Sequence, residues 1–226
     1  MESIPKDIKY EILPEEQTKY DVSFKVIVIG DSGVGKTCLT NKATKNIFDE
    51  NYNATIGFEF LTFNIKFNSK IVRLQIWDTC GQEIYRSLIT NFYRNTSMAI
   101  IVYSITSRDS FENIDMWLKE LRAHANPAVK IFLIGNKIDL ENERKILKEE
   151  GEMYAKNNCL TEFIEASAKT GINTRDTLIN IAYLLYEDYI KYKDDNSYQS
   201  DGSITSLDKS ETKSNNRKKN NKSKCC

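Results

Sequence analysis

The sequence predicts an α/β fold in which a mostly parallel β-sheet carries helices on both faces. Short apolar runs alternate along the chain with segments whose apolar residues recur at helical spacing, as in doubly wound sheets. A glycine-rich turn, residues 30–37, lies between the apolar run 22–29 and the helical segment 37–45. This order of strand, turn and helix is typical of a phosphate-binding unit.

The turn reads Gly-Asp-Ser-Gly-Val-Gly-Lys-Thr and fits the pattern G-x-x-x-x-G-K-[ST] without a gap. Its three glycines permit backbone angles that let successive N–H groups turn inward around a phosphate chain. Lys36 would reach the β- and γ-phosphates, and the Thr37 hydroxyl would bind Mg²⁺. The motif therefore favours nucleotide binding over a simple glycine-rich turn.

Length and composition suit a globular protein with tails. The chain has 226 residues, of which 40% are hydrophobic and 28% charged, and its formal net charge is zero. We expect one domain of about 170 residues. The last ten residues hold five basic and no acidic side chains, a surface too small to indicate a nucleic-acid-binding protein.

Several classes of protein are disfavoured by simple counts. The five cysteines show neither metal-ligand nor secretory spacing, so a reducing compartment is expected. Residues 1–21 contain six acidic residues and no apolar run, unlike a signal peptide. Apolar runs fall short of the ~18 residues that cross a bilayer, and Glu2 is incompatible with N-myristoylation.

Each further element is predicted from its own pattern. The polar residues 1–20 are expected to be a flexible extension, and residues 46–57 a loop. Alternating apolar residues predict an antiparallel pair, 58–67 and 70–78, joined by a tight turn. The stretch 79–93 is expected to be irregular and then weakly helical. Beyond it, the sequence predicts strands at 97–104, 129–135 and 161–166, helices around 111–121, 142–157 and 178–189, and a disordered tail from residue 193.

Polar clusters follow the predicted strands, where a sheet of this kind places its ligands. Asp78 is placed to support the Mg²⁺ shell, Gly81 to offer its N–H to a γ-phosphate, and Gln82 to orient the attacking water. Alone, this cluster is as consistent with an ordinary turn. The phosphate motif about 40 residues upstream favours the catalytic interpretation.

Two later clusters indicate the base. The Asp139 carboxylate can accept two parallel hydrogen bonds from the N1–H and 2-amino groups of guanine, a donor pair that adenine lacks. Asn136 could tie this loop to the phosphate loop, and the Lys137 stem could lie over the ring. Residues 167–169, Ser-Ala-Lys, would offer N–H groups to the guanine O6.

In this order the motifs resemble those of the small GTPases of the Ras superfamily, over about residues 20–192. The chain is most similar to the Rab branch. That similarity rests on Ile56-Gly-Phe-Glu-Phe60, on Tyr85-Arg-Ser-Leu88 with Phe92-Tyr93-Arg94, and on the final Cys225-Cys226.

The resemblance implies the P-loop small GTPase fold. Its six-stranded, mostly parallel sheet has the order 2-3-1-4-5-6, with one antiparallel strand and about five helices. The expected organisation is a flexible extension at 1–20, a GTPase domain at 21–192 and a disordered tail at 193–226 that ends in prenylated cysteines.

The resemblance also implies the site. Mg²⁺ would be held by Thr37, Thr55 and Asp78, and Phe48 would pack on the guanine. Lys36 and Gln82 are the expected catalytic residues. The residues expected to contact the nucleotide are Asp31, Ser32, Gly33, Val34, Gly35, Lys36, Thr37, Cys38, Phe48, Thr55, Gly81, Asn136, Lys137, Asp139, Ser167, Ala168 and Lys169.

Partners and location follow from the same resemblance. They are GTP and GDP, an exchange factor, a GTPase-activating protein, effectors and a lipid-shielding GDP dissociation inhibitor, with no nucleic acid. Geranylgeranyl groups on Cys225 and Cys226 would anchor the protein to the cytoplasmic face of an intracellular membrane, and it would cycle with the cytosol. Phe58, Phe60, Trp77 and Tyr93 are candidates for an effector surface or for core positions, and Phe58 and Trp77 are the ones favoured as exposed.

Two features qualify the prediction. Cys80 stands where the family usually has alanine; a tolerated packing change is favoured over a redox or hydrolysis effect. No arginine precedes Arg73, so the first switch lacks a built-in arginine finger and intrinsic hydrolysis should be slow, on the order of 10⁻⁴ to 10⁻³ s⁻¹. The alternatives are a P-loop kinase or ATPase, and a GTP-binding scaffold that does not hydrolyse.

Overall fold

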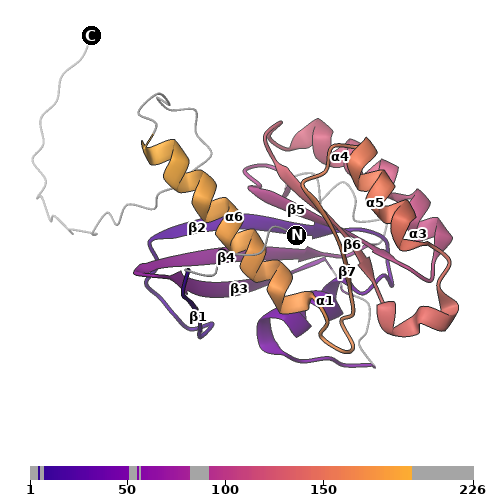
Figure 1. Cartoon of the computed structure of the whole chain (residues 1–226), viewed down its shortest axis with the longest axis horizontal. Helices are drawn as coiled ribbons and strands as arrows, with labels where there is room; N and C mark the ends of the chain where they lie inside the picture. The colour runs from indigo at the N-terminus through magenta and orange to yellow at the C-terminus, as the bar shows by residue number, and fades with distance from the viewer. Residues whose placement is uncertain (1–4, 6–7, 51–54, 56, 82–91, 195–226) are drawn as a thin grey trace, which may run out of the picture.

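A twisted sheet of seven strands forms the centre of the molecule (Figure 1). The computed structural model describes residues 5, 8–50, 55, 57–81 and 92–194. The strands are β1 Tyr10–Leu13, β2 Val22–Ile29, β3 Phe58–Phe67, β4 Lys70–Thr79, β5 Met98–Ser104, β6 Lys130–Asn136 and β7 Glu162–Ala166. The helices are α1 Lys36–Lys45, α3 Arg108–Glu112, α4 Ile114–His124, the 3₁₀ helix η3 Ile138–Glu143, α5 Lys148–Asn157 and α6 Thr174–Asp194.

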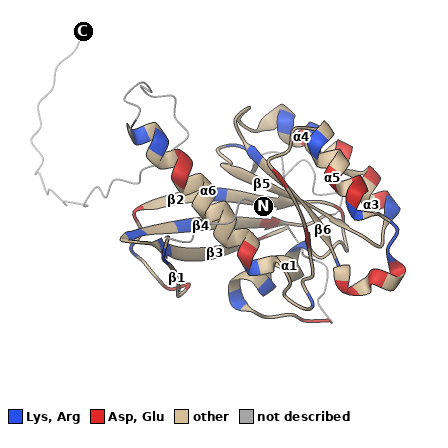
Figure 2. Cartoon of the chain, viewed as in Figure 1, with Lys and Arg blue, Asp and Glu red and all other residues tan. Residues whose placement is uncertain are grey.

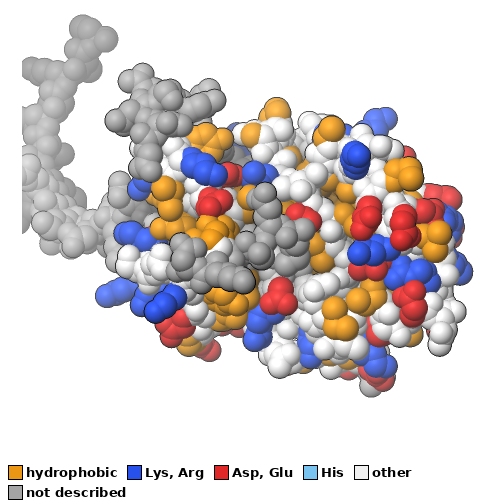
Figure 3. Space-filling model, in the orientation of Figure 1, with side chains coloured by type: hydrophobic (Ala, Val, Ile, Leu, Met, Phe, Trp, Pro, Cys, Tyr) orange, Lys and Arg blue, Asp and Glu red, His pale blue; other side chains and the backbone are white. Residues whose placement is uncertain are grey.

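Helices cover both faces of the sheet. The apolar sides of α1 and α6 pack on one face, and those of α4 and α5 pack on the other. Strand β5, Met-Ala-Ile-Ile-Val-Tyr-Ser, is buried along its whole length because it lies between the two layers. Charged side chains of both signs lie along the helices in Figure 2, and apolar side chains gather along α6 on the face drawn in Figure 3.

The strand order confirms the main topological prediction. Leaving β1 aside, the order β3-β4-β2-β5-β6-β7 is the predicted 2-3-1-4-5-6. Strand β3 pairs antiparallel with β4, whereas the ladders of β2 with β4 and β5, of β5 with β6 and of β6 with β7 are all parallel. The carboxyl ends of β2, β4, β6 and β7 therefore lie at one edge of the sheet.

The N-terminal extension differs from the expectation. Residues 1–20 were expected to be flexible and the sheet to have six strands, but β1 adds a seventh that pairs antiparallel with Asn64–Phe67 of β3. The pairing is non-local and most of β1 stays exposed, so no local apolar pattern marks it. Strand β1 covers an edge of the sheet that would otherwise present unpaired backbone groups.

Two helix boundaries also differ. The segment predicted as one helix at 142–157 is the 3₁₀ turn η3 followed by α5, with residues 144–147 between them. The predicted helix around 111–121 begins earlier and is divided into α3 and α4 at Asn113. The stretch 82–91 and the tail 195–226 lie outside the described residues, and α6 continues to Asp194, past the expected domain end at 192.

Two side chains hold the extension against the sheet. The Asn64 amide, on β3 and 1% exposed, donates to the carbonyls of Pro14 (2.8 Å) and Glu15 (3.3 Å). Its oxygen accepts a bond from Arg73 Nε (2.9 Å). The Arg73 guanidinium also donates to the Gln17 carbonyl and lies over the Tyr20 ring, 4.3 Å from its centroid.

We expect Asn64→Ala to destabilise the fold by about 1–3 kcal/mol, because it removes the partly buried hydrogen bonds of this side chain to Pro14, Glu15 and Arg73. Urea unfolding measures this cost, and hydrogen exchange of the β1 amides should become faster in the variant. Asn126→Ala is the matched control, since the exposed Asn126 side chain accepts a bond from Ala128 N within its own turn. Equal costs for the two variants would contradict the proposed anchoring.

Candidate functional site

The carboxyl ends of the strands surround a cavity of about 520 Å³. Most of the predicted nucleotide-contacting residues line it: Ser32, Gly33, Gly35, Lys36, Thr37, Cys38, Phe48, Thr55, Gly81, Asn136, Lys137, Asp139, Ala168 and Lys169. They come from segments more than 130 residues apart in the sequence, which the parallel sheet brings to one edge.

The glycine-rich loop folds around the lysine side chain. Lys36, the first residue of α1, is 5% exposed, and its Nζ donates to the carbonyls of Gly30 and Asp31, both at 2.8 Å. Burial lowers the pKa of Lys36, and the nearby Asp78 carboxylate opposes that shift. Because α1 begins at this loop, its unpaired N–H groups and positive dipole end face the cavity, an arrangement suited to an anion.

Three oxygen-bearing side chains converge beside Lys36. The Thr37 hydroxyl donates to Asp78 Oδ2, and its oxygen lies 2.7 Å from the hydroxyl oxygen of Thr55. Asp78 is fully buried, and its second oxygen, Oδ1, has no hydrogen-bond partner among the described residues. Burial raises the pKa of Asp78 to about 7, although the Thr37 bond and Lys36 both act to lower it.

This group of oxygens fits a magnesium ion. Mg²⁺ prefers hard oxygen ligands and is bound in proteins by one or two carboxylates together with phosphate oxygens and water. A buried carboxylate with one unpartnered oxygen, beside two hydroxyl groups, supplies such donors. The donor chemistry of Thr37, Thr55 and Asp78 is thus compatible with the ion that the sequence predicted.

A buried side chain connects the phosphate end of the cavity to the opposite end. Asn136 is 1% exposed; its Nδ2 donates to the Val34 carbonyl (2.9 Å), and its Oδ1 accepts a bond from Ala168 N (3.1 Å). The predicted tie between the loop at 136–139 and the phosphate loop is therefore confirmed. A second tie is made by Lys137, whose Nζ donates to the Gly33 carbonyl at 2.7 Å.

At the far end of the cavity an aspartate is held by a serine. Asp139 belongs to the η3 turn, and its Oδ1 accepts a bond from the Ser167 hydroxyl at 2.6 Å. The same hydroxyl accepts a bond from Thr170 N, so Ser167 also shapes its own turn. The carboxylate can thus face a ligand in a fixed orientation.

Some predicted residues lie away from the cavity. The Asp31 carboxylate points to α4 and accepts bonds from Asn113 Nδ2 and Trp117 Nε1, both at 2.7 Å, so it holds the phosphate loop to that helix. Val34 is buried in the core, and Ser167 acts through Asp139. Gln82, Cys225 and Cys226 lie outside the described residues.

The sequence reasoning missed Asp49, Glu50 and Leu140, which also line the cavity. Glu50 forms an ion pair with Lys169 (2.8 Å) across the cavity, and this contact raises the pKa of Lys169. Leu140 directly follows Asp139, whereas Asp49 and Glu50 lie in a loop without periodicity. An acidic pair beside Phe48 was the only available signal, and it is not specific.

The other individual predictions have mixed outcomes. Phe58 and Phe60 are 48% and 47% exposed, Trp77 is half-buried and Tyr93 is fully buried. Exposure is thus confirmed for Phe58 but only partly for Trp77. Cys80 is buried, and its N–H donates to the Gly57 carbonyl at 2.9 Å, in agreement with a packing role.

Together, the sheet order, the phosphate loop and the aspartate at the far end define a P-loop nucleotide-binding protein. Comparison with known proteins identifies the family within this class. The family model described as "Ras family" matches residues 25–187. "Ras-related protein RABA1b" of Arabidopsis thaliana is 40% identical over 194 residues, which cover 86% of this chain and 89% of that protein. The chain therefore belongs to the Ras family as a small GTPase of the Rab type, and it is a GTP hydrolase.

A pair of glycine substitutions tests the packing of the phosphate loop. Gly35 and Gly33 both have a left-handed backbone, with φ of +93° and +77°. A Cβ at position 35 would lie 2.5 Å from Asn136 Nδ2, whereas a Cβ at position 33 meets no heavy atom within 4 Å. We expect both variants to incur a backbone cost of about 1–2 kcal/mol, and Gly35→Ala to lose the Asn136 tie as well.

Urea unfolding at a fixed GDP concentration measures the difference. Gly35→Ala should be less stable than Gly33→Ala by about 1–3 kcal/mol, the cost of leaving buried polar groups unpaired. Equal stabilities would contradict the importance of the Asn136 contact at this position.

Proposed function

We propose that this GTPase is a membrane-anchored switch that binds GTP or GDP with Mg²⁺, hydrolyses GTP slowly and recruits effectors in intracellular vesicle trafficking. Nucleotide binding is supported mainly by the contacts of the Asn136 side chain, which joins the phosphate loop to the turn before Lys169. One cavity thereby contains an anion-binding helix start and a carboxylate suited to guanine.

In this proposal each residue has a defined task in phosphoryl transfer. Lys36 and the backbone N–H groups of the loop bind the phosphates, and Thr37, Thr55 and Asp78 would hold the ion. Bound Mg²⁺ would neutralise negative charge on the phosphate oxygens. Gly81 donates its N–H to the γ-phosphate, and Gln82 orients the attacking water. Catalysis then consists mainly of positioning and charge stabilisation.

The contacts around Thr55 support a switch. Thr55 is linked to Thr37, and the Gly57 carbonyl accepts the N–H of Cys80, so the segments before β3 and after β4 meet next to the phosphate end. A γ-phosphate bound to Thr55 and Gly81 would hold both segments, and hydrolysis would release them. Without an arginine finger in the first switch, fast hydrolysis requires a GTPase-activating protein, and reloading requires an exchange factor.

A cluster of aromatic rings supports the recruitment of effectors. Trp77 contacts Phe58, Phe60 and Phe92 with ring centroids 5.1–5.4 Å apart. The Lys25 ammonium lies 5.3 Å from the Trp77 ring centroid. Phe58 and Phe60 are each about half exposed and begin the strand that follows the Thr55 segment. A partner that packs on these rings would thus sense the nucleotide state.

Membrane attachment is proposed from the sequence of the tail. No helix among the residues described by the structure is long and apolar enough to cross a bilayer. Stable anchoring by lipid takes two signals, and geranylgeranyl groups on Cys225 and Cys226 beside five basic residues would supply them. A lipid-shielding GDP dissociation inhibitor would return the GDP form to the cytosol from the cytoplasmic face of its membrane.

We expect Asp139→Asn to lower affinity for GDP by about 100-fold or more, because two hydrogen bonds to a charged acceptor are lost. Affinity for xanthosine diphosphate should rise, since the new amide can donate to its 2-oxo group. The Ser167 hydroxyl can still donate to the amide oxygen, so the turn keeps its tie. Calorimetric titration with both nucleotides measures the exchange of preference; unchanged GDP affinity without gain for the xanthine nucleotide would exclude Asp139 as the base reader.

For the anchor, we expect Cys225→Ser/Cys226→Ser to be recovered in the soluble fraction of the native cell, while GTP binding and hydrolysis stay at wild-type levels. Cys159→Ser is the control, because it removes an exposed thiol from the described part of the chain and leaves the tail unchanged. Sedimentation of the double variant with membranes to the wild-type extent would contradict lipid anchoring.

A further inference from the structure

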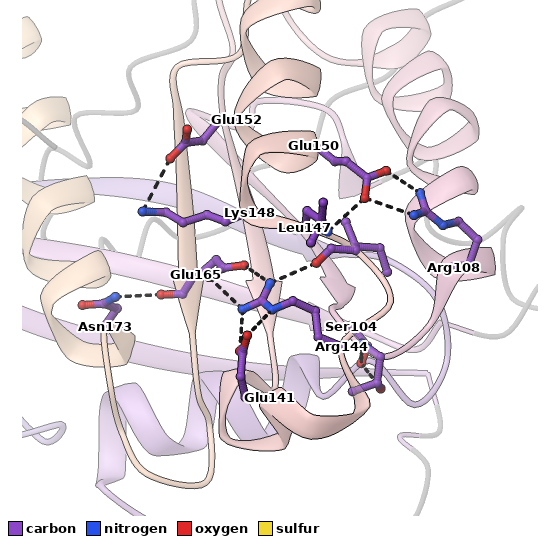
Figure 4. A network of polar contacts seen from close by, with 12 residues as sticks. Ser104, Arg108, Glu141, Arg144, Leu147, Lys148, Glu150, Glu152, Glu165 and Asn173 are labelled. Carbon is purple, nitrogen blue, oxygen red and sulfur yellow. Dashed lines mark hydrogen bonds and ion pairs between the residues drawn. The ribbon is translucent and has the colours of Figure 1, made fainter.

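An arginine outside the cavity joins the two segments that form its base end. Arg144 directly follows the η3 turn, and its side chain lies between Glu141 of η3 and Glu165 of β7 (Figure 4). Glu141 is two residues after Asp139, and Glu165 is two residues before Ser167. The guanidinium thus connects the same two segments as the Ser167–Asp139 bond, but from the outer side.

The geometry of this contact uses the full fork of the guanidinium. Nε and Nη2 donate to the two oxygens of Glu141, both at 2.8 Å. Nη1 and Nη2 donate to the two oxygens of Glu165 at 2.5 and 3.1 Å, and Nη1 also donates to the Ile146 carbonyl at 3.0 Å. Paired bonds of this kind fix orientation as well as distance, which a lysine ammonium cannot reproduce.

Burial strengthens the ion pair of Arg144 with Glu165 relative to its ion pair with Glu141. The side chains of Arg144 and Glu165 are only 12% and 13% exposed, whereas that of Glu141 is 64% exposed. Water therefore screens the bond to Glu141 more than the bond to Glu165. The Asn173 amide donates to the Glu165 carbonyl at 2.7 Å, which adds a further tie at the end of β7.

The turn that carries Asp139 needs such outside support. Lys137 has a left-handed backbone (φ 71°), and Leu140 departs from helical angles within η3 (φ −98°, ψ 43°). Backbone hydrogen bonds from Leu140 N to the Lys137 carbonyl (2.9 Å) and from Arg144 N to the Glu141 carbonyl (3.2 Å) close its two ends. Irregular backbone of this kind departs from the 3₁₀ pattern, so side-chain contacts with neighbouring segments help to hold the turn.

We propose that Arg144 is a positioning residue for base recognition: by holding Glu141 to Glu165, it keeps the Asp139 carboxylate oriented toward the 2-amino and N1–H groups of guanine. Arg144 touches no substrate atom in this scheme and acts through Asp139 and Ser167. The inference rests on the proposed role of Asp139 as the base reader.

The test compares the release of GDP with that of inosine diphosphate, which lacks the 2-amino group. A correctly oriented carboxylate favours GDP over the inosine nucleotide, since only guanine supplies both donors. In Arg144→Lys we expect GDP release to accelerate by about tenfold and inosine diphosphate release by much less, so that the ratio of the two rates moves toward one. A loss of general stability would accelerate both releases equally and leave this ratio unchanged.

Arg108→Lys is the matched control. Arg108 makes a similar paired contact with Glu150, at 2.8 and 3.1 Å, and also donates to a carbonyl, that of Lys145. The bonds between Arg108 and Glu150 join α3 to α5, and they involve no residue of the η3 turn or of β7 (Figure 4). We expect the control to keep the wild-type ratio of release rates.

Two carboxyl variants keep the proposal testable if Arg144→Lys does not fold. Glu165→Gln, which preserves size, should reduce the discrimination as Arg144→Lys does, and Glu141→Gln should reduce it less because Glu141 is exposed. An unchanged ratio in folded Arg144→Lys or Glu165→Gln would overturn the inference. If that ratio is unchanged but Asp139→Asn still changes base preference, the proposed function stands and only the role of Arg144 fails. If Asp139→Asn also has no effect, the proposed function itself fails.

Discussion

The site depends on one buried amide, the side chain of Asn136. It is the last residue of β6, and it makes hydrogen bonds both to the phosphate loop and to the turn after β7. An asparagine is suited to this position because it offers a donor and an acceptor on one short, uncharged side chain. The close approach also explains why position 35 is a glycine, since a Cβ there would meet the amide at 2.5 Å. Binding of the base can thereby help to position the phosphates, and binding of the phosphates can help to position the base.

Around Asn136 the residues of the site differ in burial. The phosphate loop follows β2 and Asn136 ends β6, two mostly buried strands, whereas Thr55 is half-buried and Phe58 is exposed. At the base end, Arg144 joins the irregular η3 turn to β7 through paired bonds to Glu141 and Glu165.

The strands and most of the cavity's motifs could be predicted from local signals, and the strand order followed from the family resemblance that those motifs carry. Apolar runs mark the buried strands, and the motifs at 30–37, 136–139 and 167–169 each follow one of them. The β1 strand could not be predicted in this way, because the N-terminal extension is held by Asn64 and Arg73, some 50 residues away in the sequence. The same holds for Glu50 and Arg144, whose roles follow from contacts with Lys169 and Glu165. For Asp31, the sequence predicted its place in the phosphate motif but not that its side chain points toward α4.

The rate of GDP release from Asn136→Ala shows whether Asn136 couples the phosphate and base ends of the cavity. The substitution leaves the Val34 carbonyl and the Ala168 N–H without their buried partner. At about 1–3 kcal/mol for each unpaired group, release should be at least about 30-fold faster than in the wild type, in protein shown to be folded by circular dichroism. Release at the wild-type rate from a folded variant would contradict this coupling.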